Sequence, residues 1–324
     1  MKSKSKNIDI LMFILNNKAM ILTILLLVIS FILTGGMAAT GNNVAGVMRQ
    51  ISVLAIISIG FTIILAGGMM DLSVGNVVSL CGILYGMTSK ILPLPLALML
   101  AVLAGVLCEF LNGVLIRAFR LPFFVLTLAT GQVFKGIAYI ITDGKSIGGL
   151  SEGVKFLGQG QVLGFLPMPF FIMILVVILM AVVLGKTTYG RHVLAAGGNA
   201  QAAEVSGIRV GFINITTLMI GGVCFGLGAA ILTGRVASAI PTAGDNYLMD
   251  SIAAVVIGGT PMHGGKAKVI GTLFGVALIG IINNMLNLLN ISSYWQWVCK
   301  GIIIIIAIVL DSMTDRFFSV RKTK

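Results

Sequence analysis

Long apolar runs separated by short polar segments dominate the hydropathy pattern of the chain. A helix that crosses a bilayer needs about 20 consecutive apolar residues, and the runs predict ten membrane spans. The predicted spans are residues 19–36, 50–67, 71–89, 94–116, 122–141, 167–185, 212–233, 248–259, 269–290 and 297–312. The eighth run is short, so we expect it either to cross the membrane or to re-enter on one side.

The composition decides what kind of protein these runs build. Apolar residues make up 58% of the 324 positions and charged residues only 10%, which is too little charge for the surface of a soluble protein. The runs lack the alternation of a membrane β-barrel. The sequence therefore predicts an all-α polytopic membrane protein with a single transmembrane domain over residues 1–324.

The net charge of +12 follows the membrane topology and gives no indication of nucleic-acid binding. Of the 22 basic residues, fifteen fall on the side that holds both termini, five fall on the other side, and Lys135 and Lys300 fall within spans. Positive charge is enriched on the cytoplasmic side of membrane proteins. We therefore expect residues 1–18, 186–210 and 313–324 to be cytoplasmic.

The polar segment 186–210 lies between two apolar runs and has features of a docking loop. Gly197 and Gly198 are expected to break an Ala-rich helix, and Asn199 is positioned to cap a second helix that carries Glu204. A short exposed helix with small residues permits close approach of another protein. The alternative, that the segment only connects two spans, stays open at this point.

Polar side chains within the spans are the candidates for a solute pathway. Such groups are costly in a membrane and usually face a bundle interior or a water-filled path, although amides also join helices and lysines reach toward the membrane surface. They are Asp71, Glu109, Asn112, Lys135, Asp250, Asn283, Asn284, Gln296 and Lys300.

Five of these form the predicted pathway: Asp71, Asn112, Asn283, Asn284 and Gln296. Within this set, Asn283 and Gln296 are expected to line a central passage, whereas Asp71, after Gly67 and Gly68, is expected to hold a break in a helix.

Two short internal sequence similarities indicate that the ten spans form two inverted sets of five. Lys-Gly-Ile occurs at 135–137 and again at 300–302, and the acid-led segment 71–80 is similar to 250–259. Inverted repeats with a pathway at their interface are common in transporters.

The sequence gives no basis for an enzyme. His192 and His263 lie in separate loops, and the spacing of His, Cys and carboxylate residues matches no metal or nucleophilic site. The segment GGTPMHGGKAK has Ala267 where a phosphate-binding loop needs Ser or Thr. We therefore expect no catalytic residue, metal or cofactor in this chain.

Five segments together carry a resemblance to a known family. They are GGMMDLSVGNVVSL (67–80), LPFFVLTLAT (121–130), YGRHVLAAGGNAQAAEVSGI (189–208), PTAGDNYLMDSIAAVVIGGTPMHGGKAKVIGTL (241–273) and NNMLNLLNISSYWQ (283–296). Across about residues 60–311 the chain resembles the permease subunits of bacterial ABC importers for monosaccharides, the ribose-type family.

The resemblance implies a ten-helix permease similar to the membrane domain of the vitamin B12 importer. Such a permease works in the inner membrane as a homodimer or heterodimer, with ATPase subunits that bind ATP and magnesium and an external sugar-binding protein. The implied ATPase-coupling residues are Gly197, Gly198, Asn199, Glu204 and Gly207. Val193 and Leu194 stand where the family more often has an aromatic residue. This departure affects the expected details of the ATPase contact and not its existence.

A secondary carrier or channel for a small polar solute is the alternative. Proton-driven carriers bury carboxylates in mid-span, whereas Glu109 is the only Glu within a predicted span here and Asp71 lies near a helix end. This scarcity favours the ATP-driven permease. The transported sugar is expected to be ribose or a similar monosaccharide.

Overall fold

The computed structural model describes residues 18–162, 164–292, 294–302, 305 and 309. Its longer helices are α2 (Lys18–Leu33), α3 (Gly41–Ala66), α4 (Val74–Thr88), α5 (Leu94–Phe119), α6 (Phe123–Thr142), α8 (Met168–Lys186), α11 (Val210–Val236), α12 (Tyr247–Ile257) and α13 (Val269–Leu288). The shorter elements are η1 (Met37–Ala39), α7 (Glu152–Gln159), β1 (Gln161–Val162), β2 (Leu166–Pro167), α9 (Thr188–Gly198) and α10 (Ala200–Val205). Residues 294–302 are also helical.

The helix lengths confirm a helical polytopic membrane protein. In the described part of the chain, α3, α5, α6, α8, α11 and α13 are long and apolar enough to span a membrane, and α2, α4 and α12 are shorter apolar helices. Helices suit a membrane because each backbone group finds its partner within the same segment. Of the predicted tenth span, 297–312, the structure describes residues 297–302, 305 and 309. The predicted terminal segments 1–17 and 313–324 lie outside the described residues.

The third predicted span begins later than predicted, whereas the eighth is as short as the sequence predicted. The third was predicted from residue 71, but residues 67–73 are not helical and α4 begins at Val74. The eighth is α12, an 11-residue helix. The late start of α4 follows from Asp71, whose Oδ1 accepts hydrogen bonds from the backbone N–H and the hydroxyl of Ser73 just ahead of the first helical turn.

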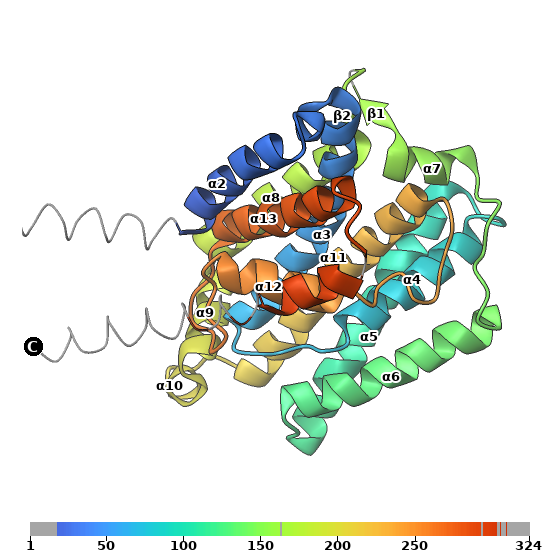
Figure 1. Ribbon diagram of the computed structural model, residues 1–324. Helices are drawn as coiled ribbons and strands as arrows, with labels where there is room; N and C mark the ends of the chain where they lie inside the picture. Colours follow the sequence, from blue (N-terminus) through green and yellow to red (C-terminus); the bar gives the residue numbers. More distant parts are fainter. Residues whose placement is uncertain (1–17, 163, 293, 303–304, 306–308, 310–324) are drawn as a thin grey trace, which may run out of the picture.

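The two ends of the molecule are marked by different short elements. The helix α7 and the hairpin β1–β2 precede α8, while α9 and α10 follow it, so they lie at opposite ends of this helix (Figure 1). We call these the α7 end and the α9–α10 end. The strands pair antiparallel, with Gln161 opposite Pro167.

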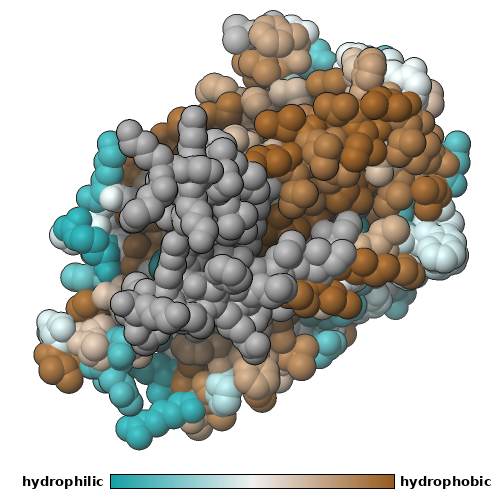
Figure 2. Space-filling view, turned by 60° about the vertical axis from the view of Figure 1, so that its left-hand side comes forward, coloured by the Kyte–Doolittle hydropathy of each residue, from teal (hydrophilic) through white to brown (hydrophobic). Residues whose placement is uncertain are grey.

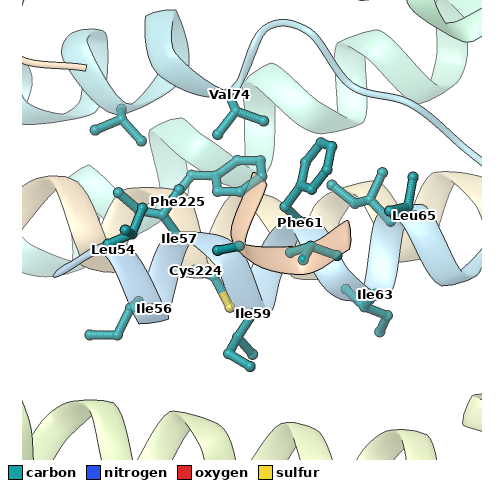
Figure 3. Packing of buried hydrophobic residues seen from close by; sticks show 14 of the residues in the cluster. Leu54, Ile56, Ile57, Ile59, Phe61, Ile63, Leu65, Val74, Cys224 and Phe225 are labelled. Carbon is teal, nitrogen blue, oxygen red and sulfur yellow. The ribbon is translucent and has the colours of Figure 1, made fainter. Parts of the chain in front are cut away.

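The core is built around α3 and α11. Residues 52–66 of α3 are buried, and α11 packs against α3, α4 and α5. Figure 3 shows Ile57, Phe61 and Phe225 among the side chains of this core. At the crossing, a Cβ atom on Gly60 would lie 2.6 Å from the Cβ of Cys224, so the small residues let the two helices approach closely.

The outer helices present apolar side chains to their surroundings. Leu25 and Phe31 of α2 are each 54% exposed, and Leu175 of α8 is 61% exposed. Figure 2 shows a broad hydrophobic area on the described surface, with hydrophilic residues along its margins. Such a surface fits contact with lipid chains.

Candidate coupling and pathway sites

The α9–α10 loop has the two-helix form that the sequence predicts. The Asn199 Oδ1 atom accepts a hydrogen bond from the Ala202 N–H at 2.9 Å and so caps α10. The break itself differs from the prediction: Gly197 and Gly198 are the last residues of α9, and the chain turns at Asn199 with an extended backbone. The residue at the turn is therefore the capping residue Asn199, and neither glycine occupies it.

The two glycines instead serve a backbone contact. A Cβ atom on Gly197 would overlap the carbonyl oxygen of Ala66 and lie 2.8 Å from the carbonyl carbon of Gly67. By contrast, a Cβ on Gly198 would meet the Gly265 Cα at an ordinary 3.6 Å. Gly197 is therefore the glycine whose replacement would force the backbones apart.

The same contact includes the loop between α12 and α13. The Gly265 N–H donates to the Ala66 carbonyl at 2.9 Å, and a Cβ on Gly264 would lie 2.6 Å from the Gly68 Cα. We call Gly67, Gly68, Gly197, Gly264 and Gly265 the glycine junction. It joins α9 directly to the end of α3 and to the α12–α13 loop, with no side chains between the backbones.

The other predicted coupling residues lie on the exposed side of the loop. Asn199, Glu204 and Gly207 are exposed, and Gly207 has φ +86° with open space around it. Val205, on the same short helix as Glu204, is 92% exposed. The sequence predicted a short exposed helix with small residues, and this exposed apolar side chain corrects that prediction.

Tyr189 ties α9 to α11 and was missed at the sequence level. Its hydroxyl lies 2.9 Å from the Thr216 Oγ1 and 3.0 Å from the Thr217 Oγ1. Burial raises the pKa of Tyr189 above its ordinary value, so the phenol stays neutral and able to donate. The sequence contains the tyrosine and the Thr-Thr pair, but they are 27 and 28 residues apart and no spacing rule connects them.

Asp71 and Asn112 belong to one buried polar cluster. The Asp71 Oδ1 accepts from the backbone N–H of Ser73 at 2.8 Å and from its hydroxyl at 2.6 Å. The Asn112 Nδ2 donates to the Ser73 Oγ at 3.1 Å and to a Glu109 carboxyl oxygen at 3.3 Å, and the Asn112 Oδ1 accepts from the Thr130 hydroxyl at 2.6 Å. The cluster connects residues 67–73 to α5 and α6.

The other three pathway candidates lie apart from this cluster. Asn284 exchanges two hydrogen bonds with Asn43, at 2.8 and 3.0 Å, and so joins α13 to α3. Gln296 donates to the Asn287 Oδ1 at 2.8 Å. Asn283 is buried on α13, and its Oδ1 has no hydrogen-bond partner among the described residues.

Two lysines within predicted spans hold acids near the start of α12. The Lys135 ammonium of α6 lies 3.0 Å from Asp245, and the Lys300 ammonium lies 2.9 Å from Asp250. These are the two lysines of the repeated Lys-Gly-Ile tripeptide. The sequence listed both among the intramembrane groups but did not pair them with acids.

The first turns of α4 meet the segment that precedes α12 inside the molecule. A Cβ on Gly75 would lie 2.6 Å from the carbonyl oxygen of Gly244, and the Gly244 N–H donates to the Ser79 hydroxyl at 2.9 Å. The first turns of α4 thus lie against the segment that leads into α12. Across the described residues, no three His, Cys, Asp or Glu side chains form a metal-binding group.

Comparison with known proteins places the chain among transport permeases. The family described as "branched-chain amino acid transport system / permease component" matches residues 43–308. The chain belongs to this permease family. The match includes the glycine junction, the α9–α10 loop and the buried polar cluster.

Curated relatives include several permeases whose names refer to sugars. The ribose import permease protein RbsC of Bacillus subtilis is 41% identical over 272 residues, which cover 83% of this chain and 84% of the relative. The protein of the same name from Haemophilus influenzae is 38% identical over 317 residues, 96% of this chain and 98% of the relative. The D-allose permease AlsC of Escherichia coli is 34% identical over 281 residues, 86% of this chain and 85% of the relative. No solved structure matches the chain.

Proposed function

We propose that this chain is the transmembrane permease subunit of an ATP-driven importer for ribose or a similar monosaccharide. The observation that carries the proposal is the 38% identity to a ribose import permease over 96% of this chain. The family is described by its amino-acid transporters, whereas the relatives that match this chain over most of its length are named for ribose, allose and arabinose. We therefore infer a sugar substrate from the names of these relatives.

The proposed assembly places partners at both ends of the molecule. An ATPase subunit binds the α9–α10 loop on the cytoplasmic side, where exposed Glu204 and Val205 offer a charge and an apolar contact. A sugar-binding protein delivers its ligand at the α7 end, and a second permease copy completes the passage. The arrangement is supported by the excess of basic residues assigned to the α9–α10 end.

The glycine junction supplies a route for coupling. Movement of α9 on the ATPase reaches the ends of α3 and of the α12–α13 loop through backbone contacts. The end of α3 continues into α4 and the loop begins at the end of α12, and these two short helices are also linked where Gly75 of α4 contacts Gly244 ahead of α12. Displacement at the ATPase therefore changes the position of both short helices at once.

The same geometry supports the finer fold proposal of ten helices in two inverted sets of five, with a likeness to the vitamin B12 importer's membrane domain. The pairs α3–α4 and α11–α12 each consist of a long helix, a non-helical segment and a short helix. Interrupted helices that meet at the interface of two repeats are typical of transporters, because their free backbone groups can contact a polar solute.

Within this scheme the pathway groups act by weak, replaceable hydrogen bonds. A sugar hydroxyl left without a partner in hydrocarbon costs several kcal/mol, so the passage must offer donors and acceptors. Asn283, whose Oδ1 has no hydrogen-bond partner in the described part of the chain, is the proposed lining residue together with Gln296. Asp71 and Asn112, enclosed in the buried cluster, are proposed to hold the α3–α4 connection.

Reconstitution in proteoliposomes tests the proposal against the carrier alternative, for which the buried carboxyls Asp71 and Glu109 are the motivating feature. The permease is combined with a candidate ATPase and a candidate sugar-binding protein, and uptake of labelled ribose is measured. We expect uptake that requires ATP and both partners. Uptake by the permease alone, driven by a proton gradient, would establish the carrier instead.

A further inference from the structure

A groove at the α9–α10 end is not explained by the coupling or pathway sites. It has a volume of about 620 Å³ and lies between α2, α8, α9 and the start of α13. Its walls are mostly apolar and include Met20, Leu184, Leu194 and Phe274. This size falls in the range of small-ligand sites, about 300–1,000 Å³.

The charged residues of the groove have one sign. Among the described residues that line it, Arg191 and Lys268 are charged and none is acidic. Both are exposed side chains. Arg191 belongs to α9, and Lys268 immediately precedes α13. The polar end of the groove therefore attracts an anion, while the rest of its wall excludes water.

The groove opens at the level where the apolar surface of the helix bundle ends. Ile178 and Leu179 on α8 are 57% and 60% exposed, as lipid-facing residues are, and α8 ends at Lys186 next to the groove residue Gly185. The boundary between lipid chains and headgroups lies at such a transition. An occupant with an apolar tail and an anionic head fits this position.

We propose that one anionic phospholipid occupies this groove. An acyl chain lies along the apolar wall, and the lipid phosphate binds the Arg191 guanidinium and the Lys268 ammonium. Because Arg191 is on α9, the lipid holds the ATPase-coupling helix to the membrane. That consequence rests on the proposed function, whereas lipid binding itself needs neither ATP nor sugar.

The charge half of the proposal is tested by native mass spectrometry of the intact permease. We expect phosphatidylglycerol to remain bound where phosphatidylcholine is lost. Arg191→Gln and Lys268→Gln should each weaken phosphatidylglycerol binding roughly fivefold, the effect of one basic side chain near an anionic membrane surface. The matched controls Arg120→Gln and Arg209→Gln remove exposed charges at the same end, outside the groove, and should retain binding.

The position of the acyl chain is tested by fluorescence quenching. Phe274→Trp places a reporter in the groove wall, and its signal is read as the difference from the parent permease in nanodiscs with bromine on the acyl chains. We expect stronger quenching by brominated phosphatidylglycerol than by brominated phosphatidylcholine. A Cβ on Gly185 meets no atom of the described residues within 4 Å, so Gly185→Phe should fill the groove and abolish this difference. Val182→Phe, on the exposed face of α8, should preserve it.

Three results would overturn the proposal. Equal quenching by the two brominated lipids would remove the anionic preference. Quenching that appears only after residues 1–17 are deleted would identify the chain's own N-terminal segment as the occupant. Binding of inorganic phosphate at Arg191 and Lys268, with no phospholipid retained, would show an anion site without a lipid chain. None of these results depends on sugar transport, so they leave the proposed function unaffected.

Discussion

The connection between α3 and α4 is held at two places by opposite means. At the α9–α10 end, the glycine junction brings Gly68 and Gly197 together through backbone atoms alone. Deeper in the bundle, Asp71 accepts from Ser73, and side-chain hydrogen bonds connect Ser73 to α5 and, through Asn112, to α6. The junction depends on the absence of side chains, whereas the cluster depends on their chemical identity. Each region should therefore fail under a different kind of substitution.

The largest effect is expected from the smallest added group. Gly197→Ala places a methyl group against the Ala66 carbonyl and the Gly67 backbone, and overpacking of this kind costs about 1–3 kcal/mol of unfolding free energy. ATP-driven uptake should fall at least tenfold. Thermal unfolding and uptake in proteoliposomes measure the two effects.

Gly198→Ala is the matched control for that substitution. Its added methyl would meet the Gly265 Cα at 3.6 Å, an ordinary contact. Stability and uptake should stay close to those of the parent. Equal losses from the two substitutions would show that the junction does not distinguish its glycines.

Charge reversal on the exposed side of the loop should act without any loss of stability. Glu204→Arg changes an exposed side chain that we propose faces the ATPase, so ATPase retention during purification should fall about tenfold while the unfolding temperature is unchanged. Glu152→Arg, an exposed acid on α7 at the opposite end, should retain the ATPase. Full ATPase retention by Glu204→Arg would remove this residue from the contact.

A change of identity in the buried cluster should reduce assembly more than turnover. Asp71→Asn weakens the hydrogen bonds that the carboxylate accepts from Ser73, at a cost of about 1–2 kcal/mol. The yield of folded permease should fall, while uptake per folded molecule is preserved. A stable, assembled variant that is blocked only in transport would make Asp71 a pathway residue.

The smallest effect is expected at Tyr189. Tyr189→Phe removes the hydroxyl contacts with Thr216 and Thr217, which should cost about 0.5–1.5 kcal/mol. Burial raises the pKa of this phenol, so its contribution to stability is complete below the ordinary tyrosine pKa and is lost as the pH rises through the higher folded-state value. Unfolding temperatures from pH 8 to 11 should converge for parent and variant at the alkaline end. A difference in unfolding temperature that stays constant over this pH range would show that ionisation of the Tyr189 hydroxyl is not coupled to folding.

The sequence predicted the membrane fold well because apolar run length is a local property. The bounds of α5, α6 and α8 lie within a few residues of the predicted spans, and the Asn199 cap is present where it was expected. Contacts between distant segments were not predictable in the same way. The requirement for glycine at position 197 comes from Ala66 and Gly265, and only the folded chain brings those residues together.

The pathway candidates show the same limit at the level of chemistry. Residue type identified Asp71 and Asn112 as buried polar groups but did not indicate that Ser73 and Thr130 would enclose them. Likewise, Lys135 and Lys300 were found through a repeated tripeptide, while their acidic partners Asp245 and Asp250 follow from packing. Whether Asn283 and Gln296 line a passage stays a prediction.

Labelling from one side of the membrane tests the central claim most directly. In a variant without the four native cysteines, Ser151→Cys and Ala202→Cys introduce single exposed thiols at the α7 end and on α10. The account predicts that an impermeant reagent labels Ser151→Cys in intact cells. It should label Ala202→Cys only in permeabilised cells, and bound ATPase should protect that thiol. Labelling of Ala202→Cys from outside intact cells would contradict both the topology and the assignment of α9–α10 as the coupling loop.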